Sequence, residues 1–212
     1  PVVTSSTLDK CLARAKEMIG WDEKYPCRDM GNGKVRAVGA AIAMQGSSIA
    51  KVDVGGASIK LGEDGSYTLG LGATDMGTGC DTILSQMAAD VLETDFDNIV
   101  VFGVDTDISP YDSGSYASAT TYITGIAVAD ACEQMREKIK KLGAEMLGAD
   151  IEKVEFDGKR VYMLEGEGEV SLEAIAAKGT SGNNTSLQAS ATRSSQISPP
   201  PFMAGAVEIE FD

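Results

Sequence analysis

The segment from Gly72 to Asp81, Gly-Ala-Thr-Asp-Met-Gly-Thr-Gly-Cys-Asp, lies where an expected strand ends and an expected helix begins. Glycines at 72, 77 and 79 let the backbone approach a ligand closely, because no Cβ atom stands in the way. The free N–H groups of a helix start and its dipole favour an anion. The spacing fits neither the phosphate loop nor the dinucleotide fingerprint. The spacing of the glycines alone indicates either a turn whose backbone amides bind an anion or an ordinary strand-to-helix turn.

A second group of polar residues precedes the longest helical pattern in the chain. Residues 105–107 and 112–115 are rich in Asp and Ser, and they lead into Tyr116-Ala117-Ser118-Ala119-Thr120-Thr121. Hydroxyl groups at a helix start can cap the helix, or they can form hydrogen bonds with a phosphate or a polar heterocycle. Two helix starts of this kind suggest a single shared ligand.

The composition excludes several classes of protein. The chain has 18 basic and 32 acidic residues, for a net charge of −14, so nucleic acid and anionic lipid are not expected as partners. No stretch approaches the roughly 18 apolar residues of a membrane span, and we expect a cytoplasmic protein. Histidine is absent, which excludes Ser-His-Asp catalysis and histidine-dependent metal sites. The four cysteines form no C-x-x-C pair, and we expect free thiols.

Apolar residues recur every three to four positions in four segments, which are therefore predicted to be helices. They are residues 7–19, the segment after Gly79 as far as 92, residues from about 117 to 147, and residues 172–177. We expect Gly20 to stop the first helix and Trp21 to begin a loop. Gly143 is expected to end or kink the long helix early.

Short apolar runs and alternating patterns predict the strands. They are residues 35–44, which we expect to be buried, the hairpins 57–61 with 66–71 and 154–156 with 160–164, and residues 99–102 and 202–211. The Ser-, Thr- and Asn-rich segment 183–198 is predicted to be a loop or a weakly patterned strand held from outside. The fold class is α+β, with helices packed on mixed, hairpin-rich sheets. The chain is interpreted as one region, 1–212, with two subdomains of about 1–150 and 151–212 as an option.

The order of these motifs resembles the molybdenum-binding subunit of the xanthine dehydrogenase family, the molybdenum hydroxylases. Four segments carry the resemblance: 75–79 (Asp-Met-Gly-Thr-Gly), 105–110 (Asp-Thr-Asp-Ile-Ser-Pro), 117–120 (Ala-Ser-Ala-Thr) and 125–128 (Gly-Ile-Ala-Val). Residues 19–21 and 198–210 extend the similarity over nearly the whole chain. The resemblance implies the fold of a molybdenum-cofactor-binding domain and a piece of the molybdopterin-binding region.

The resemblance also implies a set of residues that hold the cofactor. They are Gly77, Thr78, Gly79, Ala117, Ser118, Ala119, Thr120 and Glu133. Thr78 stands where the family has a Gln beside the molybdenum-bound pterin, so a shorter polar side chain takes that place and the substrate chemistry is expected to differ. Glu133 stands where the family often has a second Gln. A carboxylate there would prefer the N–H edge of the pterin and avoid the phosphate.

The implied activity is the hydroxylation of a purine-like heterocycle, such as hypoxanthine, or of an aldehyde. In the family, a Glu in a Gly-Glu-Pro motif activates a molybdenum-bound hydroxide, and electrons leave through two [2Fe–2S] clusters and FAD. This chain has no Gly-Glu-Pro motif, no cluster-type cysteine set and no flavin segment. We therefore expect an excised or truncated piece that has no catalytic residue or metal ligand of its own, is inactive alone and lacks molybdopterin when isolated. Its implied partners are the other molybdenum-subunit domains and the iron–sulfur and FAD subunits or domains.

Two other functions remain open at this point. The first is a non-catalytic anion-binding or assembly domain that uses the same two helix starts. The second is a metal-independent enzyme in which Asp75, Asp81, Asp105 and Asp107 act as paired acids. Scattered acidic residues in a chain of net charge −14 are typical of a solvated surface, which weakens the second alternative. Molybdopterin content of the parent protein distinguishes the hydroxylase from the first alternative.

Overall fold

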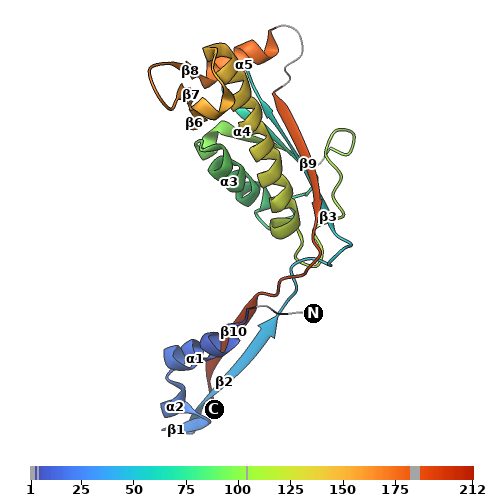
Figure 1. Cartoon of the computed structure of the whole chain (residues 1–212). Helices are drawn as coiled ribbons and strands as arrows, with labels where there is room; N and C mark the ends of the chain where they lie inside the picture. Colours follow the sequence, from blue (N-terminus) through green and yellow to red (C-terminus); the bar gives the residue numbers. More distant parts are fainter. Residues whose placement is uncertain (1–2, 4, 104, 182–186) are drawn as a thin grey trace. The chain divides into compact units, whose positions relative to one another are not determined.

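The computed structural model describes residues 3, 5–103, 105–181 and 187–212. The chain divides into two compact units (Figure 1). The first unit combines residues 1–47 with 197–212, and the second comprises residues 48–196.

The first unit is built on a three-stranded antiparallel sheet in the order β1-β2-β10. The strands are β1 (Cys27–Gly31), β2 (Lys34–Met44) and β10 (Phe202–Phe211). β2 and β10 pair along ten residues, from Phe202 opposite Met44 to Phe211 opposite Val35. Helix α1 (Leu8–Ile19) packs against β10. Strands from the N-terminal part and the C-terminal part of the sequence therefore form one sheet.

Trp21 begins a short helix, α2 (Trp21–Lys24), so the prediction of a loop at this residue was wrong. Gly20 adopts a left-handed conformation with φ of +69°, which ends α1 and turns the chain. The Tyr25 N–H then donates to the Trp21 carbonyl at 2.9 Å, and the two rings stack with centroids 4.6 Å apart. This stacking favours a helical turn over an open loop.

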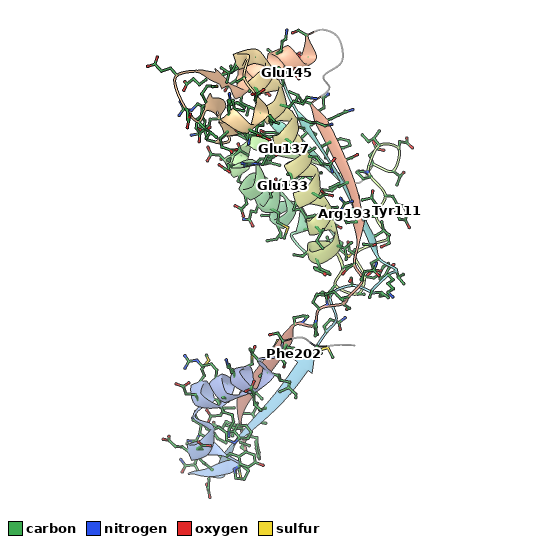
Figure 2. All side chains as sticks on the ribbon, in the orientation of Figure 1. Tyr111, Glu133, Glu137, Glu145, Arg193 and Phe202 are labelled. Atoms are coloured by element: carbon green, nitrogen blue, oxygen red, sulfur yellow. The ribbon has the colours of Figure 1, made fainter. Side chains whose placement is uncertain are left out.

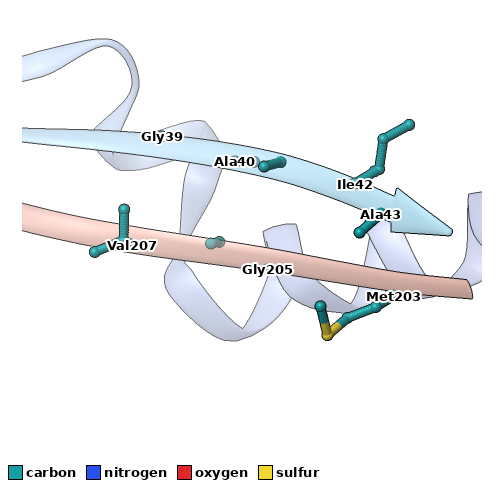
Figure 3. Close-up of a pocket in the computed structure, with 9 residues that line it drawn as sticks. Gly39, Ala40, Ile42, Ala43, Met203, Gly205 and Val207 are labelled. Atoms are coloured by element: carbon teal, nitrogen blue, oxygen red, sulfur yellow. The ribbon is translucent and has the colours of Figure 1, made fainter. Parts of the chain in front are cut away.

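The prediction that residues 35–44 form a buried strand was also wrong, because β2 is exposed from Gly39 to Met44. On one face of the β2–β10 pair, the small residues of β2 lie beside large residues of β10. Met203 and Val207 on this face are more than half exposed. The face forms a shallow groove of about 500 Å³ that is lined by apolar residues (Figure 3). We call it the apolar groove, and its lining is Gly39–Ala43, Met203 and Gly205–Val207.

The second unit contains a four-stranded sheet in the order β5-β4-β3-β9. Its strands are β3 (Val54–Leu61), β4 (Tyr67–Leu71), β5 (Ile99–Phe102) and β9 (Gln188–Ser194). β3 and β4 form the predicted hairpin, and β5 runs parallel to β4 after helix α3 (Cys80–Leu92) and the short helix η1 (Phe96–Asn98). β9 pairs with β3, so the polar segment near the C-terminus is a strand that is held in the sheet by its hydrogen bonds to β3. Residues 183–186 of that predicted segment lie outside the described residues.

The longest helix begins later than the sequence predicted. Ala117 and Ser118 have φ of +51° and +58°, which a right-handed helix does not accommodate. A π-helical turn, η2 (Thr120–Thr124), therefore precedes α4 (Gly125–Leu147). The helix does not end at Gly143, because α4 continues to Leu147. A Cβ on Gly143 would lie 2.6 Å from the Val161 Cβ, so this glycine admits a neighbouring strand instead.

Helices α3 and α4 pack together and supply side chains to one core with the sheet (Figure 1). A smaller sheet, in the order β6-β7-β8, also packs on α4. The elements of this region are η3 (Ile151–Lys153), β6 (Val154–Phe156), β7 (Arg160–Met163), β8 (Glu169–Ser171) and α5 (Leu172–Thr180). Because they share the core with α4, the units separate near residues 47 and 197 and not near residue 150. The predicted α+β class, with helices on mixed sheets, is confirmed.

Arg136 on α4 joins three elements of the second unit. Its guanidinium donates to the Val91 carbonyl at 2.8 Å, to Glu93 Oε1 at 2.7 Å and to the Phe156 carbonyl at 3.4 Å. We predict that Arg136→Met lowers the free energy of unfolding by about 1–3 kcal/mol, because two partly buried carbonyls lose their donor. Glu93→Gln, which removes only the half-exposed ion pair, should cost less than about 1 kcal/mol. Chemical denaturation measures both, and equal losses would contradict the prediction.

Candidate cofactor site

The turn between β4 and α3 is organised by the side chain of Asp75. Asp75 Oδ1 accepts hydrogen bonds from the Gly77 N–H at 2.8 Å and the Gly79 N–H at 3.2 Å, and Oδ2 accepts one from the Asp81 N–H at 3.4 Å. Gly77 and Gly79 have φ of +103° and +75°, in the region that favours glycine. The bonds from Gly77 and Gly79 lower the pKa of the Asp75 carboxyl. The chain thus supplies its own anion to the start of α3.

This arrangement corrects the sequence-based expectation that the amides of the turn form an open anion cradle. Three of these amides already donate to Asp75. Thr78 lies between the two left-handed glycines, and its side chain is exposed. Open space surrounds the positions where Cβ atoms would stand on Gly77 and Gly79. The turn therefore offers a polar side chain and an unobstructed backbone surface to a ligand, while three of its amides are already engaged.

The polar loop that follows β5 is bonded to the sheet and to the start of the long helix. Asp112 Oδ2 accepts a hydrogen bond from Thr124 Oγ1 at 2.8 Å, and its Oδ1 accepts one from the Gly114 N–H at 2.8 Å. The Ser113 N–H donates to the Val54 carbonyl at 2.8 Å. These bonds fix the loop between β3 and η2.

Three glycines allow this loop and η2 to touch the sheet backbone. A Cβ on Gly72 would lie 2.4 Å from the Pro110 carbonyl oxygen, and one on Gly56 would lie 2.5 Å from the Tyr111 carbonyl oxygen. A Cβ on Gly55 would lie 2.8 Å from the Thr124 Cα. Gly72 therefore allows the loop to pack directly against the backbone at the end of β4. The adjacent Gly55-Gly56 pair is the sequence signal from which this contact could have been predicted. The two predicted segments meet here, beside a cleft of about 570 Å³ lined by Gly72, Thr74, Asp105, Thr106 and Ser109–Asp112.

Residues 117–120 combine backbone strain with an unpaired hydroxyl. Ala117 and Ser118 are non-glycine residues in the left-handed region, a conformation that concentrates at functional sites. The Ala117 carbonyl accepts from the Ser48 N–H at 2.8 Å, and Ala119 is buried. Thr120 Oγ1 is buried and has no hydrogen-bond partner within the part of the chain that the structure describes. Buried hydroxyls in folded proteins usually have a hydrogen-bond partner, and Thr120 Oγ1 has the capacity to donate or accept one.

Glu133 is separated from the other predicted site residues. It is exposed on α4, where Figure 2 shows it with Glu137 and Glu145 along the helix. Glu133 follows Thr120 by 13 positions, which corresponds to about 20 Å along a helix. A contact from Glu133 to a group held at residues 117–120 therefore requires a long ligand.

Among the described residues, one group of possible metal ligands lies in this region. Ligand atoms of Asp75, Cys80 and Asp81 lie within 4.8 Å of one another. Burial raises the pKa of the Cys80 thiol, and the Asp75 carboxylate is engaged by the turn amides. Both effects disfavour a metal ion. The engagement of Asp75 by the turn amides also counts against Asp75 and Asp81 as a pair of catalytic acids.

Comparison with known proteins identifies the family. The family model described as "Molybdopterin cofactor-binding domain" matches residues 14–212. The chain therefore belongs to the molybdopterin cofactor-binding domain family. It is 38% identical over 183 residues to "Probable hypoxanthine oxidase XdhD" of Escherichia coli K12, and 30% identical over 149 residues to "Xanthine dehydrogenase molybdenum-binding subunit" of Escherichia coli O157:H7. These alignments cover 86% and 68% of this chain, but only 19% and 20% of the relatives.

Solved structures show the same fold. The CO dehydrogenase of Oligotropha carboxidovorans superposes with a TM-score of 0.81 at 19% identity, over 99% of this chain and 29% of that one. The quinoline 2-oxidoreductase of Pseudomonas putida 86 gives 0.78 at 19% identity, over 98% and 29%. In the described parts of this chain, no helix combines the length and the apolar character needed to cross a membrane.

The close approach at Gly72 yields a prediction about stability. Gly72→Ala places a methyl group against a backbone carbonyl that is itself held by the loop, so the loop must move. We expect a loss of about 1–3 kcal/mol in the free energy of unfolding. Gly103→Ala is the control, since the nearest atom to its Cβ would lie at 3.7 Å. If both variants unfold at the same denaturant concentration, the close contact is not a constraint on the fold.

The lowered pKa of Asp75 predicts a pH dependence. In the unfolded chain an Asp titrates near pH 3.9, and in the folded chain Asp75 titrates lower, so its ionised form stabilises the fold above that pH. This contribution disappears as the pH falls through the folded value. The difference in stability between the wild type and Asp75→Asn should therefore be constant near neutral pH and shrink below about pH 4. Denaturant titrations at several pH values measure it, and a difference that grows in acid would contradict the assignment.

Proposed function

We propose that this chain forms one wall of the molybdopterin pocket in a xanthine-dehydrogenase-type molybdenum hydroxylase. The main observation behind this proposal is the buried hydroxyl of Thr120, which has no hydrogen-bond partner among the described residues and lies beside the strained residues Ala117 and Ser118. Membership of the molybdopterin cofactor-binding domain family supports the proposal. A pterin offers N–H and carbonyl groups, and the hydroxyls of Thr120, Ser118 and Thr78 are matching neutral donors and acceptors.

In the proposed mechanism the chain binds and orients, and it carries out no chemical step of its own. The molybdenum cofactor, when bound, supplies the oxidation of an electron-poor carbon. The Thr120 hydroxyl forms a hydrogen bond with the pterin from a buried position, where water does not compete. The hydroxyls of Ser118 and Thr78, both on exposed residues, fix its orientation from the surface of the pocket. The catalytic base comes from another part of the enzyme.

We infer the partners from the proportion of the relatives that this chain covers. The chain spans about a fifth of the length of the two curated relatives. The remaining molybdenum-subunit domains then supply the opposite wall of the pocket and the catalytic Glu, and iron–sulfur and FAD partners accept the electrons. The proposed substrate is a purine-like heterocycle or an aldehyde, and the proposed location is the cytoplasm.

The competing anion-binding function has less support. It needs free amides in the turn before α3, and the amides of Gly77, Gly79 and Asp81 already donate to Asp75. An assembly role without a cofactor would leave the Thr120 hydroxyl buried with no described partner.

Thr120→Val in the full-length protein tests the proposed function. Valine keeps the shape of threonine but removes the hydroxyl, and a lost hydrogen bond of about 1–1.5 kcal/mol should weaken cofactor binding by roughly 5- to 12-fold. Molybdenum and pterin per chain, measured after dialysis against a competing apoprotein, report the loss. Thr68→Val, on the exposed side of β4, is the matched control. If Thr120→Val keeps as much pterin as Thr68→Val, the proposed role of Thr120 is wrong.

A further inference from the structure

A buried carboxylate closes the turn that leads into β3. Asp53 is only 1% exposed, and its Oδ2 accepts a hydrogen bond from the Ile49 N–H at 2.6 Å. In return, the Asp53 N–H donates to the Ile49 carbonyl at 3.1 Å. The two reciprocal bonds join the ends of the turn. We call residues 48–53 the brace.

The brace is bonded to two segments that lie far from it in the sequence. The Ser48 N–H donates to the Ala117 carbonyl at 2.8 Å. The Lys51 N–H donates to the Ser195 carbonyl at 2.7 Å, and the Ser195 and Tyr122 hydroxyls form a hydrogen bond at 2.9 Å. The brace therefore holds the chain both before and after the buried hydroxyl at the start of η2.

Backbone strain is concentrated in the brace and in the segment that it holds. Ser48 and Lys51 have φ of +84° and +66°, and Ala117 and Ser118 are left-handed as well. Among the described residues, four of the six non-glycine residues with positive φ belong to these two segments. Such conformations persist only where the surrounding structure enforces them. The brace and the strained residues therefore hold each other in place.

We propose that Asp53 is a positioning residue that acts through the brace to place the Thr120 hydroxyl for the cofactor. This inference rests on the proposed function for the identity of the ligand and deepens it. Asp53 contacts the brace and not the ligand. Its action goes through Oδ2, because Oδ1 is buried and has no hydrogen-bond partner among the described residues.

The two oxygen atoms of Asp53 determine which substitutions are informative. Asp53→Asn keeps the shape and one acceptor oxygen for the Ile49 N–H, so the brace should survive. Asp53→Ala removes the acceptor, so the brace should open. Asp64→Ala is the matched control, since Asp64 Oδ1 accepts from the Ser66 N–H at 3.0 Å in the exposed turn between β3 and β4.

Hydrogen exchange of the full-length protein, measured by mass spectrometry, tests the brace without reference to the cofactor. In Asp53→Ala, we expect the amides of residues 48–51 to exchange at least roughly tenfold faster, because local opening no longer breaks the bond to Asp53. Asp53→Asn and Asp64→Ala should match the wild type in this peptide. A peptide from residues 80–92 of α3 reports whether the second unit remains folded.

Pterin retention by the full-length protein tests whether the brace acts through Thr120. Asp53→Ala should weaken retention by no more than the roughly 5- to 12-fold expected for Thr120→Val. In the Thr120→Val background it should add less than about twofold, because the hydroxyl that it positions is gone. A general loss of stability would instead multiply the two effects. Asp53→Asn should restore retention.

Tyr122→Phe gives a second route to the same test if Asp53→Ala does not fold. It removes one hydroxyl and with it the hydrogen bond to Ser195. We expect a smaller loss of pterin, about 2- to 5-fold, and again only where Thr120 is present.

Three results would overturn the inference. The first is unchanged exchange of residues 48–51 in Asp53→Ala. The second is pterin retention in Asp53→Ala as high as in Asp64→Ala, and the third is an equal loss in the Thr120→Val background. If Thr120→Val alone keeps its pterin, the proposed function fails, while the exchange experiment still decides whether Asp53 holds the brace.

Discussion

The second unit depends on a backbone contact that no side chain could enter. The Pro110 and Tyr111 carbonyls lie so close to Gly72 and Gly56 that a Cβ there would stand within 2.5 Å of an oxygen atom. This contact seats the polar loop on the sheet, and Asp112 then reaches the Thr124 hydroxyl in η2. The loop and the helix start are thereby fixed on either side of the left-handed residues at 117 and 118. The buried hydroxyl at Thr120 follows directly after them.

The distribution of charge explains how an acidic chain can take part in binding an anionic cofactor. Long-range attraction is absent at a net charge of −14, so recognition must rely on short-range hydrogen bonds and shape. Asp75 accepts hydrogen bonds from three amides of the turn before α3, and the exposed residues Thr78 and Ser118 carry hydroxyls that are proposed to face the pterin. The chain spans about a fifth of the length of the two curated relatives, and we propose that other parts of the enzyme complete the pocket.

Local patterns predicted most elements of the fold but not the contacts that build the site. Periodicity identified α3, α4 and the β3–β4 hairpin, because their apolar faces are set by residues close in sequence. The burial of β2 was mistaken, since its apolar residues look alike whether they face a core or an open groove. The hydrogen bonds from the turn amides to Asp75 were not predicted, because the sequence does not show whether an Asp side chain accepts bonds from its own turn or faces solvent. The eight site residues remain predictions carried by resemblance to the family.

The most direct test of this account is a structure of the full-length protein with its cofactor bound. The account predicts a pterin atom within roughly 3.2 Å of Thr120 Oγ1 and a polar contact from Thr78 to the same ligand. A bound pterin that leaves Thr120 without a hydrogen-bond partner would contradict it.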